Sequence, residues 1–136
     1  WTQDIHQALW RKLAINCAIN PLAALHRCRN GELAANAALA HEVESLCTEI
    51  KTIGIAAGQA AAVEQLQAQV AAVIAGTADN RSSMLQDVVA GRETEIDYLC
   101  GYLVRVADQL GLRAPRNEAM LRAVQALLPR PPGSRG

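Results

Sequence analysis

The chain has 136 residues, of which 51% are hydrophobic and 19% charged, and its formal net charge is zero. This length and composition are typical of one globular domain and exclude a chain that is disordered as a whole. The balanced charge argues against nucleic acid as a partner. The longest nearly apolar run, residues 13–25, is too short to cross a bilayer, so no membrane partner is expected.

The first helix is predicted to begin near Thr2 or Asp4, because either side chain can cap it. An apolar stripe at steps of four is expected to face the core: Ile5, Leu9 and Leu13. Because the proline ring opposes a helix interior, we expect a break or kink before Pro21. Asn20 would then cap a short second helix that starts with this proline.

The middle of the chain predicts a turn and two further helices. Residues 29–31 form the turn, since Asn and Gly tolerate positive φ. A long helix follows from about Leu33 or Asn36 to Ile53, and another spans residues 60–75, with Gly54 and Gly58 bracketing a loosened connection. The positions expected to face inward in these two helices are Leu39, Val43, Leu46, Ile50, Ile53, Val63, Leu66, Val70 and Val73.

A polar link over residues 77–81 precedes a short helix that Ser82 or Ser83 caps. Thr94 is predicted to cap the next long helix, which ends at Gly111. Its inward stripe is Ile96, Leu99, Leu103, Val106 and Leu110. A last helix follows over residues 115–128. No strand-like run appears, so residues 1–128 are predicted to be an all-α, multi-helix domain, followed by a disordered tail, 129–136.

The four cysteines form no CxxC pair, and most lie in apolar helical settings. They are Cys17, Cys28, Cys47 and Cys100. This usage predicts reduced, buried thiols in a cytoplasmic protein. His26 beside Cys28 is too weak a signal to indicate a metal site, and none is expected.

Lys12, Asn16 and Asn20 are polar residues spaced by four in a nearly apolar stretch. This spacing places them on one side of a helix, one turn apart. A buried amide without a partner costs roughly 1–3 kcal/mol. These amides are therefore either satisfied inside the protein, or they face a polar ligand.

The stretch over residues 12–22, KLAINCAINPL, resembles the signature that opens the C-terminal domain of ketopantoate reductases. The resemblance continues, in the same order, through CRNGEL at 28–33, SSMLQD at 82–87 and TEID at 94–97, and then into Gly101-Tyr102-Leu103. It implies an all-α fold like the C-terminal domain of ketopantoate reductase and 6-phosphogluconate dehydrogenase. It also implies NADPH-dependent reduction of a small 2-oxo acid, 2-dehydropantoate, to (R)-pantoate in pantothenate biosynthesis.

The same resemblance implies roles for individual residues. Lys12 matches the general acid that protonates the substrate carbonyl oxygen, and Glu95 matches a glutamate near the lysine, the substrate and the cofactor. The residues at substrate-binding positions are Asn16, Asn20, Asn30 and Ser83. The residue types alone leave a structural alternative open for each position. Lys12 can be a solvated helix lysine, and Asn16 and Asn20 can bridge helices or cap them. Asn30 can be a turn residue, Ser83 a helix cap, and Glu95 an acid in the first turn of a helix. Asp87 and Asp97 are interpreted as solvated or structural.

The sequence contains no glycine-rich dinucleotide motif after a strand, so this chain is not expected to bind NADP by itself. The resemblance implies an N-terminal Rossmann domain as partner, absent from this chain, and we expect the isolated chain to be inactive. Two alternatives remain at this point: a paralogous reductase of another 2-oxo acid, or a non-catalytic helical interaction or dimerisation module. Self-association as a homodimer also stays open.

Overall fold

The computed structural model describes residues 2–128, and the predicted tail 129–136 lies outside the described residues. Within residues 2–128 all regular structure is helical, which confirms the all-α prediction. The helices are α1 (Thr2–His26), α2 (Glu32–Ala35), α3 (Ala37–Ala56), α4 (Ala60–Val63), α5 (Leu66–Gly76), α6 (Ser83–Val89), α7 (Cys100–Gln109) and α8 (Pro115–Gln125).

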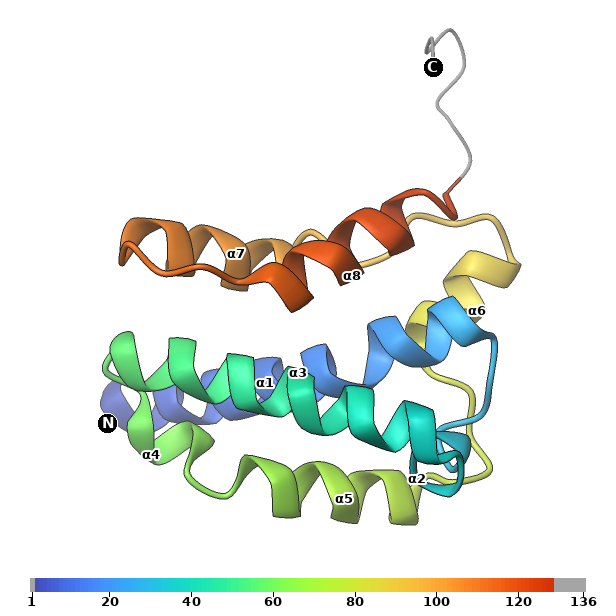
Figure 1. Cartoon of the computed structure of the whole chain (residues 1–136), viewed down its shortest axis with the longest axis horizontal. Coiled ribbons are helices and arrows are strands. Elements are labelled where there is room, and N and C mark those ends of the chain that lie inside the picture. Colours follow the sequence, from blue (N-terminus) through green and yellow to red (C-terminus); the bar gives the residue numbers. More distant parts are fainter. Residues whose placement is uncertain (1, 129–136) are drawn as a thin grey trace, which may run out of the picture.

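Helices α1 and α3 pack against each other at the centre of the fold. Figure 1 shows α7 and α8 side by side on one face of this pair, and α4 and α5 on the other. The short α6 packs against α1. Fully buried alanines along α1, including Ala14, Ala18 and Ala23, allow this close approach of helices. No helix within residues 2–128 combines the length and apolar character needed to traverse a bilayer.

Helix α1 runs without interruption through Pro21, so the predicted break before this residue is wrong. Asn20 consequently lies inside the helix and caps nothing. A proline in a helix interior costs roughly 3 kcal/mol. Leu22 and Ala23, which follow it, are fully buried. Burial of this last part of α1 offsets that cost, which the local sequence cannot reveal.

The predicted inward stripe of α1 is also wrong at its start. Ile5 is 59% exposed and Leu9 is 60% exposed, whereas Trp10 and Ala14 are buried. The helix therefore turns a different side to the core, and no described element covers Ile5 and Leu9. At about 100° per residue these two side chains share a face of α1 with Lys12.

The connection between α3 and α5 differs from the prediction. Gly54 is buried inside α3 instead of loosening it, because Val63 packs directly against it. The predicted helix over residues 60–75 is divided into α4 and α5, and Val73 is exposed while Ile74 is buried. Gly58 makes the turn before α4 with a φ of +79°.

Helices α7 and α8 are shorter than predicted. Thr94 caps no helix: its hydroxyl accepts a hydrogen bond from the Ile96 amide at 3.3 Å, and turns occupy residues 95–99 before α7 begins. Leu110 lies just beyond α7 and is exposed, and Gly111, with a φ of +71°, follows as the predicted stop. Helix α8 ends at Gln125, before Leu128.

Candidate active site

Lys12, Asn16 and Asn20 lie along one face of α1, as their spacing predicts. Lys12 is exposed, and both asparagines are half-buried. Lys12 and Asn16 line an open hollow of about 350 Å³ that reaches Val73 of α5. The first two members of the row therefore share one cavity.

Asn20 lies in a second, smaller pocket of about 220 Å³, with Ser83 of α6 and Glu95 of the turn before α7. Met84, Asp87 and Leu99 complete its wall. Three predicted site residues from distant parts of the sequence therefore meet in one cavity. The pocket is therefore lined by one amide, one hydroxyl and two carboxylate groups, together with the apolar side chains of Met84 and Leu99.

The two serines of the SSMLQD stretch have different positions. The Ser82 hydroxyl accepts a hydrogen bond from the Leu85 amide at 3.1 Å and caps α6, and the residue is buried. Ser83 is the first residue of the helix, is exposed, and lines the pocket. Because Ser82 supplies the cap, the Ser83 hydroxyl does not serve as the cap of α6.

Glu95 stands in a turn and not in the first turn of a helix as predicted. Its carbonyl accepts hydrogen bonds from the amides of Tyr98 at 2.9 Å and Leu99 at 3.0 Å, which fixes the turn. Within the described residues, the Glu95 carboxylate makes no ion pair with Lys12. These two residues line separate cavities.

Asn30 lies apart from both cavities and is buried. Its side-chain amide donates to the Thr77 hydroxyl at 3.0 Å, and its backbone amide donates to the Asn80 carbonyl at 3.0 Å. Next to it, a Cβ on Gly31 would lie 2.9 Å from the Cβ of Ala78, so only glycine permits this approach. In this structure the asparagine joins the turn after α1 to the loop that leads to Ser82.

The four cysteines are free and buried, in agreement with their predicted state. Burial raises the pKa of the Cys47 thiol to about 11, and it also raises the pKa of the Cys17 thiol. Neither residue lines the cavities that hold the predicted site. No group of three or more metal-binding side chains occurs within residues 2–128.

The sequence over residues 4–128 matches the family model described as ketopantoate reductase PanE/ApbA C terminal. The chain belongs to this ketopantoate reductase family. It is 46% identical over 131 residues to the 2-dehydropantoate 2-reductase of Vibrio cholerae, a match that covers 93% of this chain and 43% of that protein. It is 42% identical over 125 residues to the Yersinia pestis 2-dehydropantoate 2-reductase, covering 92% of this chain and 40% of that one. The chain thus spans 40–43% of the length of these relatives.

Solved structures of the ketopantoate reductase family share this fold. The probable 2-dehydropantoate 2-reductase of Bacillus subtilis has a TM-score of 0.77 at 36% identity, covering 86% of this chain and 39% of that chain. A ternary structure of D-mandelate dehydrogenase has a TM-score of 0.84 over 91% of this chain and 69% of its own. At 23% identity, that likeness concerns the fold alone.

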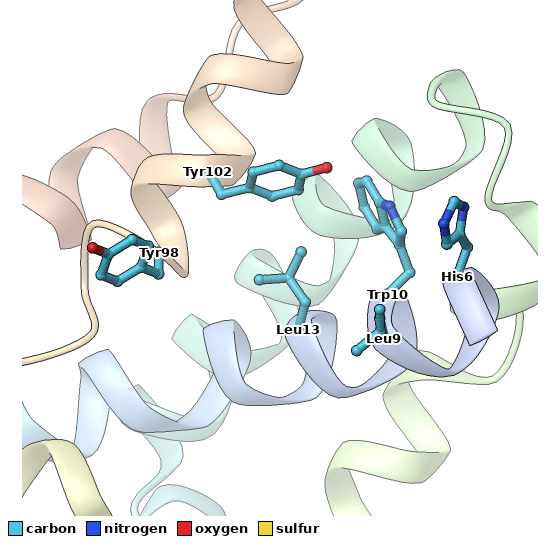
Figure 2. Close-up of a pocket in the computed structure, with 6 residues that line it drawn as sticks. All are labelled: His6, Leu9, Trp10, Leu13, Tyr98 and Tyr102. Carbon is cyan, nitrogen blue, oxygen red and sulfur yellow. The ribbon is translucent and has the colours of Figure 1, made fainter.

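This ketopantoate reductase domain has a further hollow of about 400 Å³, which was not predicted from the sequence. Figure 2 shows side chains of α1 facing two tyrosines across it. Trp10 and Tyr102 meet edge to face with ring centroids 6.1 Å apart, and Tyr98 is 77% exposed. The signal in the sequence is the apolar stripe that contains Leu9, but periodicity alone cannot tell a core stripe from an uncovered one.

Proposed function

We propose that this chain is the substrate-binding and catalytic C-terminal domain of an NADPH-dependent 2-dehydropantoate 2-reductase. The reaction would convert 2-dehydropantoate to (R)-pantoate for pantothenate biosynthesis in the cytoplasm. The observation that carries the proposal is the pocket in which Asn20, Ser83 and Glu95 meet. Membership of the ketopantoate reductase family and the names of its relatives support it.

The geometry of α1 restricts where the substrate can lie. A rise of 1.5 Å per residue places Lys12 and Asn20 roughly 12 Å apart along the helix axis. A substrate acid with a four-carbon main chain that contacts both residues must therefore lie over Asn16. The flexible four-carbon stem of Lys12 then has to swing toward it. The neutral side-chain amides of Asn16 and Asn20 can bind carboxylate, carbonyl and hydroxyl oxygens of the substrate without adding a buried charge.

Lys12 is the proton donor of the proposed reaction. Its ammonium group carries three donor hydrogens and is the only cation among the proposed site residues. Placed against the carbonyl oxygen at C2, it stabilises the negative charge that develops there and transfers a proton to it. The Ser83 hydroxyl donates to the substrate carboxylate, as the family pattern implies. Asn30 is a further proposed substrate contact, although its side-chain amide donates a hydrogen bond to Thr77 in this structure.

NADPH, when bound, supplies the hydride to C2 of the substrate. Within residues 2–128 there is no strand, and the proposal therefore assigns most of the dinucleotide contacts to an N-terminal Rossmann domain. From this chain, Glu95 fits a cofactor contact, because a carboxylate at the pocket wall can accept hydrogen bonds from ribose hydroxyls or a carboxamide.

The uncovered apolar face of α1 is where we place the contact with that N-terminal domain. Ile5, Leu9 and Tyr98 are all more than half exposed, and the first two share the face that carries Lys12. The relatives are more than twice as long as this chain, so a further domain is expected to cover part of it. A domain seated there would close over the α1 row and exclude water from the substrate.

The proposal is tested with a chimera in which this chain replaces the matching segment of the Vibrio cholerae relative. The chimera should oxidise NADPH in the presence of 2-dehydropantoate, whereas the isolated chain should not. Lys12→Ala should lower kcat by about 10²- to 10⁴-fold, as expected for loss of a general acid. Lys51→Ala is the matched control, because Lys51 lies on α3 outside both cavities.

Three outcomes decide between the proposal and its alternatives. No turnover by a chimera that folds and binds NADPH would overturn it in favour of a non-catalytic module. Higher kcat/KM with a different 2-oxo acid would identify a paralogous reductase. Equal effects of the two lysine variants would remove Lys12 from the chemistry.

The domain contact has its own test. Leu9→Lys should lower the thermal midpoint of the chimera and leave that of the isolated chain unchanged, because the leucine is covered only in the chimera. Ile55→Lys is the control, since Ile55 is also exposed but lies at the end of α3. Equal shifts of the chimera and the isolated chain with Leu9→Lys would contradict this placement.

A further inference from the structure

We propose that Asp87 determines specificity by accepting a hydrogen bond from the terminal hydroxyl of a 4-hydroxy-2-oxo acid. This inference rests on the proposed function and names the group that reads the end of the substrate farthest from its carboxylate. It starts from a residue for which the sequence indicates only a solvated or structural role. In the structure, Asp87 lines the same pocket as Asn20, Ser83 and Glu95.

The spacing between Asp87 and Ser83 fits a short hydroxy acid. Both residues lie on α6, four positions apart, and both line the pocket. Side chains at this spacing project from the same helix face with Cβ atoms about 5–6 Å apart. An acid with a four-carbon main chain whose carboxylate binds the Ser83 hydroxyl can therefore present its C4 hydroxyl to Asp87.

The Asp87 carboxylate is held in place but keeps a free acceptor. Its Oδ1 accepts from Nε of Arg92 at 3.1 Å, and its carbonyl accepts from the Arg92 amide at 2.8 Å. This hydrogen bond engages Oδ1 and leaves Oδ2 to accept from a ligand. The Asp87 side chain is only 27% exposed, while that of Arg92 is 62% exposed and lies on the solvent side.

The charges of the pocket set the orientation of the ligand. Asp87 and Glu95 both carry carboxylates, which repel the substrate carboxylate and attract a hydroxyl donor. The carboxylate end of the ligand is thereby directed toward Ser83 and the amides of α1. A site that binds a substrate hydroxyl in this way discriminates against an analogue that lacks it, because the protein acceptor then loses its partner.

The test compares two substrates that differ only in this hydroxyl, 2-dehydropantoate and 3,3-dimethyl-2-oxobutanoate, in the Vibrio cholerae chimera. Asp87→Ala should lower kcat/KM for 2-dehydropantoate by about 10- to 100-fold, the range for a lost hydrogen bond to a charged group. The value for 3,3-dimethyl-2-oxobutanoate should stay within about threefold. Asp87→Asn keeps an acceptor oxygen of the same shape and should recover part of the loss.

Arg92→Gln separates recognition from structure. If Asp87 acted only through its ion pair, Arg92→Gln would reproduce the loss of discrimination, and the inference would be wrong. An equal fall for both substrates with Asp87→Ala would also overturn it. Should the unsubstituted chimera fold and bind NADPH but reduce neither acid, the proposed function fails, an outcome distinct from failure of the Asp87 assignment.

Discussion

Glu49 of α3 binds the first turn of α8 through the fully buried Asn117. One carboxylate oxygen, Oε1, accepts hydrogen bonds from the backbone amide of Asn117 at 2.8 Å and from its side-chain amide at 2.9 Å. The other, Oε2, accepts from the amide of Arg116 at 2.9 Å. The carboxylate thus satisfies helix-terminal donors that the residue before α8, Ala114, cannot cap with its side chain.

Glu49→Ala is therefore expected to lower the free energy of unfolding by about 2–3 kcal/mol, because it leaves a buried amide without its acceptor. Urea denaturation of the isolated chain followed by circular dichroism measures this change. Glu118→Ala is the control, since Glu118 makes only an exposed pair with Arg122 and should change stability by less than about 1 kcal/mol. A loss for Glu49→Ala no larger than the control would contradict the cap.

The neighbouring serines Ser82 and Ser83 should respond differently to the same change. Ser82→Ala removes the cap of α6 and should cost about 1 kcal/mol of stability. Ser83→Ala should leave stability within about 0.5 kcal/mol. In the Vibrio cholerae chimera, Ser83→Ala should nevertheless raise KM for 2-dehydropantoate. Thermal unfolding and steady-state kinetics on both variants measure the two effects, and a reversed pattern would refute the assignment of the cap to Ser82.

Asn30 and Thr77 provide a test of whether the asparagine contacts substrate or only the loop. Asn30→Ala and Thr77→Val both break the 3.0 Å hydrogen bond between these side chains. Each variant should cost about 1–3 kcal/mol of stability. If Asn30 also binds the substrate, Asn30→Ala in the chimera will raise KM well beyond the increase for Thr77→Val. Equal KM values for the two variants would restrict Asn30 to holding the loop.

The contact between Gly54 and Val63 joins α3 to α4. A Cβ at position 54 would lie 2.8 Å from one methyl carbon of Val63 and 3.1 Å from the other. Gly54→Ala should therefore destabilise the fold by about 1–3 kcal/mol despite the better helix propensity of alanine. Adding Val63→Ala should remove the clash, so the double variant should be more stable than the sum of the single effects predicts. Strict additivity in denaturation experiments would contradict this close packing.

The sequence predicted the local features well where a single side chain decides them. The Asn36 side chain accepts a hydrogen bond from the Leu39 amide at 3.1 Å at the start of α3, and Gly111 ends α7 with a positive φ, both at predicted boundaries. The prediction was wrong at Pro21, where α1 continues through the proline, and at residues 94–99, where Thr94 caps no helix. At both places tertiary packing outweighs the local conformational preference of the residue. A proline penalty of roughly 3 kcal/mol is comparable with the burial of one or two large apolar side chains.

By itself, the sequence determined an all-helical chain of the ketopantoate reductase family and the row formed by Lys12, Asn16 and Asn20, because helical periodicity and motif order are local properties. Only the tertiary structure decided that Ser83, Asp87 and Glu95 lie in one pocket with Asn20, and that Leu9 is uncovered. The physical reason is that a pocket depends on contacts between residues more than sixty positions apart, and helix periodicity cannot specify which neighbour, if any, covers an apolar face.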